Sequence, residues 1–96
     1  MKISASDQVT AWVQSLSPDA KRRVRAELKL LSKGKGDIKS LQRDLSGFYR
    51  IRIGEHRIIF HYTPGENGPE CFCDFAEARD VVYEQFAAIL SEEGRI

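Results

Sequence analysis

The chain has 96 residues, enough for one domain with a single modest core and too few for two. Hydrophobic residues make up 42% and charged residues 30%, the composition of an ordinary soluble globular protein. No stretch approaches the roughly 18 apolar residues that a membrane span needs, and the first residues lack the apolar segment of an export signal. We therefore expect one cytoplasmic domain over residues 1–96, without a membrane partner.

The formal net charge of +1 gives the whole chain no electrostatic attraction to nucleic acid. The charges are nevertheless unevenly spread. Most lysines and arginines fall between residues 21 and 57, where only Glu27, Asp37, Asp44 and Glu55 oppose them. Such a basic middle is compatible with local binding of a phosphate backbone, although a solvated helix face explains much of it equally well.

Two cysteines, Cys71 and Cys73, stand two residues apart with no other cysteine in the chain. This spacing is too short for a zinc knuckle and lacks partner ligands. Both side chains would project to the same face of a strand, where small buried apolar residues are common. We expect reduced thiols, no metal and no cofactor.

The first half of the chain predicts two successive helices, preceded by a short edge strand at residues 2–4. After Asp7, apolar residues recur at helical spacing up to Leu16. Ser17, Pro18 and Asp19 then restart a helix, because serine is a good N-cap and proline fits the first helical position. The second helix should end at residues 33–36, where paired glycines interrupt the pattern.

Residues 45–60, LSGFYRIRIGEHRIIF, predict a β-hairpin with its turn at Gly54 and Glu55. Successive side chains on a strand point to opposite faces, so pairing across this turn places Arg50, Arg52 and Arg57 on one surface. Three guanidiniums on one small sheet are typical of an anion site. The plain alternative is a solvated sheet face, where arginines are ordinary.

The remaining segments complete the expected architecture. We expect a connection at 38–47, a loop at 63–69, a third strand at 71–75 and a last helix at 77–90. The order predicts an α+β domain in which a helical hairpin packs on one face of a small antiparallel sheet, with a C-terminal helix. The other face of the sheet would be open or concave.

The residues of this hairpin resemble a known family. LSGFYRIR at 45–52, HRIIF at 56–60 and ARDVVY at 78–83 resemble the RelE/ParE superfamily, the toxins of type II toxin–antitoxin, or plasmid stabilisation, modules. The resemblance covers nearly the whole chain and implies a RelE-like fold and a cognate antitoxin protein. RelE-like members are ribosome-dependent mRNA endoribonucleases, or mRNA interferases, that inhibit translation, whereas ParE-like members poison DNA gyrase. A degenerate, antitoxin-binding member is a third alternative.

The resemblance also implies site residues. Arg50, Arg52, Arg57 and Tyr83 carry over as the catalytic set of a ribonuclease, in which the arginines supply cations for the phosphate but are poor bases.

We further expect Arg79, His61 and Phe48 to contact RNA, with Arg79 beside Tyr83 unless Asp80 holds it in an ion pair. The chain departs from the RelE pattern at Glu77, where the pattern has a basic residue. It also has Lys39 where another ribonuclease branch has its catalytic glutamate.

Overall fold

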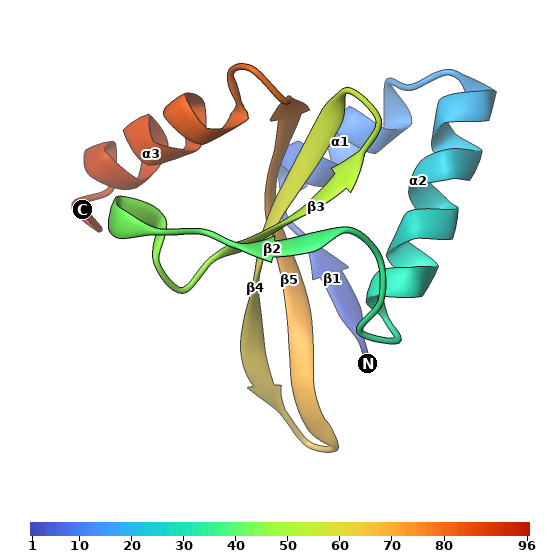
Figure 1. The fold of residues 1–96 in the computed structure, drawn as a ribbon, viewed down its shortest axis with the longest axis horizontal. Coiled ribbons are helices and arrows are strands. Elements are labelled where there is room, and N and C mark those ends of the chain that lie inside the picture. The colour runs from blue at the N-terminus through green and yellow to red at the C-terminus, as the bar shows by residue number, and fades with distance from the viewer.

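A computed structural model describes residues 1–96 and shows three helices arranged around one five-stranded sheet (Figure 1). No helix is long and apolar enough to cross a membrane. The elements in chain order are β1 (Ile3–Ala5), α1 (Asp7–Gln14), α2 (Pro18–Leu31), β2 (Ile38–Ser40), a 3-10 turn (Arg43–Leu45), β3 (Tyr49–Ile53), β4 (His56–Gly65), β5 (Gly68–Ala78) and α3 (Val82–Glu92).

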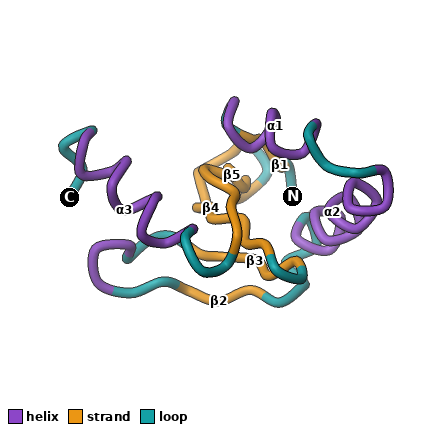
Figure 2. The backbone as a smooth tube through the Cα atoms, turned by 90° about the horizontal axis from the view of Figure 1, so that it is seen from above, coloured by secondary structure: helices purple, strands orange, loops and turns teal.

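The sheet has the order β1-β5-β4-β3-β2. All neighbouring strands run antiparallel except β1, which pairs parallel to β5. In Figure 2, α1 and α2 lie on one side of the sheet and α3 lies on the other. The predicted α+β class, with a helical hairpin on a small sheet and a C-terminal helix, is confirmed.

Both predicted helix starts are capped by serine. The hydroxyl of Ser6 accepts a hydrogen bond from the amide of Val9, and the hydroxyl of Ser17 accepts one from the amide of Ala20. Pro18 is the first residue of α2, where its missing N–H costs no hydrogen bond.

The first core lies between this helical hairpin and the sheet. Buried residues of the two helices, such as Val9, Val24 and Leu31, pack against the face that presents Ile58 and Phe60. Cys71 and Cys73 lie in the same core as free thiols, which confirms their expected role as small buried apolar residues. Burial raises the thiol pKa to about 11 for Cys71 and about 12 for Cys73, so both stay protonated and unreactive at neutral pH.

The opposite face of the sheet is covered, so the expectation of an open or concave face is wrong. Ile59 and Phe75 project from β4 and β5 into a second core, where α3 contributes Val82, Phe86 and Leu90. The apolar residues between the cations of the hairpin therefore pack against the chain's own last helix. This core places the first turn of α3 over the strands that carry the arginines.

Three boundaries differ from the sequence expectation. The connection at 38–47 contains a short strand, β2, which pairs with β3. The expected loop at 63–69 is mostly strand, because β4 and β5 stay paired until Gly65 faces Gly68 across the two-residue turn Glu66–Asn67. Residues 77 and 78 continue β5 opposite Arg57 and His56, so α3 begins only at Val82.

The outer edge of β5 is closed by side chains where β1 ends. The side-chain amide of Gln8 donates to the carbonyl of Ala76 at 2.7 Å and accepts from the Ala76 amide at 2.9 Å. The amide of Ser6 donates to the carbonyl of Cys73, and its hydroxyl donates to the carbonyl of Asp74. These contacts continue along β5 the hydrogen bonding that the three residues of β1 begin.

Candidate functional site

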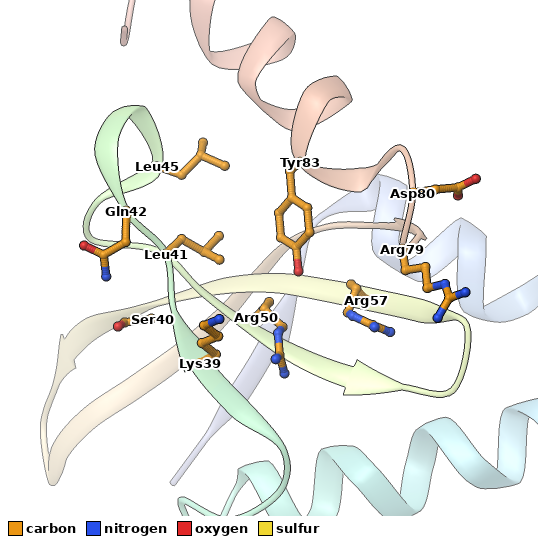
Figure 3. A pocket seen from close by; sticks show the side chains of 10 residues that line it. All are labelled: Lys39, Ser40, Leu41, Gln42, Leu45, Arg50, Arg57, Arg79, Asp80 and Tyr83. Atoms are coloured by element: carbon orange, nitrogen blue, oxygen red, sulfur yellow. The ribbon is translucent and has the colours of Figure 1, made fainter.

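A pocket of about 630 Å³ opens where the start of α3 meets β2 and the β3–β4 hairpin (Figure 3). Its lining combines cations with a few apolar side chains and a single acid. The lining residues are Lys39, Ser40, Leu41, Gln42, Leu45, Arg50, Arg57, Arg79, Asp80 and Tyr83. We call this site the arginine pocket.

The hairpin register brings the cations together. The strands reverse at the predicted turn, where Gly54 has a φ of +60° and Ile53 faces His56. Arg52 lies directly opposite Arg57, as the alternation of the strands predicts. On the other side of β3, Lys39 of β2 lies opposite Arg50, which adds a fourth cation to this part of the sheet.

Arg57 is the most buried charge of the protein, with 9% of its surface exposed. Its Nη1 donates to the carbonyl oxygens of Gly54 at 2.8 Å and His56 at 2.9 Å, and no carboxylate lies within 4 Å of its nitrogens. Glu77 faces it across the strands, but that carboxylate accepts from the Ala78 amide instead. A buried cation without a counter-ion favours an anion in the pocket beside it.

The side chain of Arg50 is 15% exposed and binds the segment that precedes β2. Its Nη1 donates to the Asp37 carbonyl at 2.7 Å and to the Asp37 carboxylate at 3.0 Å. The hydrogen bond from Arg50, helped by the charges of Arg50, Arg52 and Arg57, holds the pKa of Asp37 below its usual value despite some desolvation.

Arg79 precedes α3 and is fixed to the hairpin turn. Its amide donates to the carbonyl of Glu55 at 2.8 Å, and its Nε lies 3.1 Å from the Glu55 carboxylate. The alternative in which Asp80 pairs with Arg79 is therefore wrong, because the turn supplies the acid. In Figure 3, Arg79 lies at the Arg57 end of the pocket and Asp80 points away from it.

Tyr83 enters the pocket from the first turn of α3. Figure 3 shows its hydroxyl directed toward the β3–β4 hairpin, which carries Arg50 and Arg57, with Leu41 and Leu45 to one side of the ring. The pocket thus has a cationic floor and a partly apolar wall. This combination accommodates a phosphate on the arginines and a planar ring against the tyrosine and leucines.

The structure does not bring the other predicted site residues into this pocket. Arg52 is exposed and lines a separate hollow with Arg23, Glu27 and Asp37.

Phe48 packs in the second core, with its ring 5.0 Å from that of Phe86. His61 contacts the Phe48 ring and holds the carboxylate of Asp74 at 2.7 Å through its Nδ1. These side chains lie along α3, away from the cations that surround Tyr83.

Sequence reasoning missed the contribution of β2 and the segment after it. Lys39, Leu41 and Gln42 all line the arginine pocket, whereas the sequence predicts only a connection there. The alternation of Ile38, Lys39 and Ser40 is too short to identify a strand, and its pairing with β3 depends on tertiary context.

Together, the helical hairpin, the mixed sheet and the helix packed on its second face define a class, the RelE-like toxin fold, as the hairpin residues predicted. The likeness is to solved structures, since no protein-family model and no curated protein sequence matches the chain.

Three similar structures illustrate the match. The YoeB/ParE toxin from Agrobacterium tumefaciens has a TM-score of 0.67 at 16% identity, over 82% of this chain and 99% of that one. The archaeal RelE–RelB complex from Pyrococcus horikoshii has a TM-score of 0.61 at 23% identity, over 81% of this chain and 93% of that one. The RelBE2 toxin–antitoxin complex from Mycobacterium tuberculosis has a TM-score of 0.64 at 16% identity, over 81% of this chain and 96% of that one. At these identities the likeness is one of fold.

Proposed function

We propose that this chain is the toxin of a type II toxin–antitoxin module and that it cleaves mRNA on the ribosome. The observation that carries the proposal is Arg57, a nine-tenths buried cation without an acidic partner, which lines a pocket with three further cations and Tyr83. On a RelE-like fold, such a pocket suits the phosphodiester of an RNA strand.

In the proposed reaction, a ribose 2′-oxygen attacks the adjacent phosphorus while its proton passes to solvent water. The bond from phosphorus to the 5′-oxygen breaks, which leaves a 2′,3′-cyclic phosphate and a 5′-oxygen that takes up a proton. Arg57 and Arg79 stabilise the charge that develops on the phosphate oxygens. Tyr83 is positioned to stack on a base or to pass a proton to the leaving oxygen. Lys39 and Arg50 extend the cationic floor for the neighbouring phosphate.

We propose a cognate antitoxin as the protein partner, in keeping with the RelE–RelB and RelBE2 complexes of the similar structures. Because α3 covers the second face of the sheet, an antitoxin has no bare sheet face to occupy. The cationic pocket and the exposed Arg52 beside it are the surfaces that suit the acidic side chains of such a segment.

Inhibition of DNA gyrase is the second candidate function, and one observation favours it. The arginine pocket contains no histidine, and its only carboxylate, Asp80, points away from Tyr83. A site without a well-placed base suits binding of a phosphate backbone or an acidic protein better than RNA cleavage. A degenerate member that only binds its antitoxin would share this feature.

Induction of the chain in a bacterium without an antitoxin tests the proposal. Rapid loss of translation, with new mRNA ends inside translated codons, is the expected result. Arrested DNA synthesis with intact mRNA would instead support the gyrase function, and normal growth would support the degenerate member. The Tyr83→Ala variant is the matched control, because it should abolish the cuts while the protein still accumulates.

A further inference from the structure

Two carboxylates that are not themselves part of the pocket lining each hold one of the arginines of the arginine pocket. Asp37 binds Arg50 at one end, and Glu55 binds Arg79 at the other. Both carboxylates are solvent-exposed, with 56% of the Asp37 side chain and 73% of the Glu55 side chain accessible. Arg57, between them, has no such partner.

We propose that Asp37 and Glu55 are internal counter-ions, which occupy Arg50 and Arg79 in the free protein and compete with the anionic ligand for them. The inference rests on the proposed phosphodiester-binding role of the pocket. On this inference, Asp37 and Glu55 lower the affinity of the pocket for its anionic ligand without contacting that ligand.

The geometry of the pairs supports competition rather than permanent structure. Each carboxylate is exposed and lies on a short connecting segment between two elements, so its side chain can swing away. Exposed ion pairs are weak, so loss of either pair should change the affinity for an anion by at most roughly fivefold. A ligand that brings two phosphates can replace both carboxylates at these arginines.

The Asp37 carboxylate is not needed to hold Arg50 in position. Nη1 of Arg50 is held by the backbone carbonyl of Asp37 at 2.7 Å as well as by its carboxylate, and that carbonyl also accepts from the Arg52 amide. The orientation of Arg50 should therefore survive loss of the carboxylate, while the competing charge disappears.

The test measures binding of two probes, a short single-stranded oligoribonucleotide and inorganic pyrophosphate, to the purified full-length protein. Asp37→Asn and Glu55→Gln should each bind both probes roughly three- to fivefold more tightly. Glu66→Gln is the matched control, because it removes the same charge at the distant β4–β5 turn and should change affinity little. Asp37→Ala separates the two roles, since it should also tighten binding if the carboxylate competes.

Unchanged or weaker binding of both probes by the Asp37 and Glu55 variants would overturn the inference. Equal tightening by Glu66→Gln would also overturn it, because net charge alone would then explain the gain. If pyrophosphate binds and responds as expected while the oligoribonucleotide does not bind, the counter-ion inference stands and the ribonuclease function fails. Binding of neither probe would overturn both.

Discussion

The guanidinium of Arg57 donates to the carbonyl oxygen of Gly54 at 2.8 Å, across the turn of the hairpin to which both residues belong. The same nitrogen also donates to the carbonyl of His56 at 2.9 Å. Arg57 therefore stabilises the turn with one nitrogen, and its remaining N–H groups are available to the arginine pocket. Arg57, the residue that we propose as the main phosphate ligand, therefore also stabilises the hairpin.

Arg57→Ala should accordingly reduce both stability and toxicity. The variant removes two hydrogen bonds and buried packing, so we expect the free energy of unfolding to fall by about 1–3 kcal/mol. Chemical denaturation measures this loss. The exposed Arg52→Ala should stay within about 0.5 kcal/mol of the parent. An equal effect of the two variants would contradict this difference.

Tyr83→Phe separates the hydroxyl from the ring. Its hydroxyl points into the pocket while its ring packs beside the second core, so the variant should keep its stability. If Tyr83 passes a proton, RNA cleavage in a ribosome-dependent assay should fall about 10²- to 10⁴-fold. If it only stacks on a base, Tyr83→Phe should retain activity and Tyr83→Ala should lose it. Full activity in both variants would remove Tyr83 from the site.

Asp74 gives the stability a pH dependence of defined sign. Desolvation raises its pKa, against the opposing hydrogen bond and charge of His61 and the charge of Arg95. A carboxyl with a raised pKa in the folded state favours folding most when protonated. Its contribution therefore falls as the pH rises from its unfolded pKa of about 4 through its folded pKa.

Asp74→Asn keeps the shape of the side chain and removes the buried charge. The free energy of unfolding of this variant, relative to the parent, should increase as the pH rises from about 3 to 6. Denaturation curves at several pH values measure the difference. The exposed Glu66→Gln should show no such trend, and a constant difference for Asp74→Asn would show that this carboxyl titrates alike in both states.

Phe86 joins α3 to the sheet. Its ring lies 5.0 Å from that of Phe48 and 5.9 Å from that of Phe75. Phe86→Ala should cost about 3–5 kcal/mol, since a buried phenylalanine leaves a large cavity. Hydrogen exchange should locate the loss first in α3. The exposed Ala88→Gly, on the same helix, should cost only about 1 kcal/mol. Uniform loss of protection would show that α3 does not open separately.

The sequence predicts the first core well and the second poorly, for a physical reason. Capping residues and the glycine-led turn are local signals, and Ser17 and Gly54 occupy the expected roles. The alternation along β3 and β4 likewise fixes which side chains share a face. Ile59 lies among cations in that pattern, so its burial under α3 depends on packing between segments distant in the chain.

The site shows the same division. Arg50, Arg57, Arg79 and Tyr83 could be named from the sequence, and the structure brings them to one pocket. The sequence could not show that Arg52 faces another hollow or that Glu55 rather than Asp80 binds Arg79. The second difference follows from the late start of α3, which leaves Arg79 beside the hairpin turn.

The side chain of Gln8 also affects whether β5 can pair with a strand of another molecule. With Ser6 and β1, it satisfies the backbone of β5 from Cys71 to Ala76 on the side away from β4. An incoming strand would find no free amides there and would have to strip away the start of α1 first. Gln8, Ser6 and β1 together thus protect the central part of a long strand from edge-to-edge aggregation.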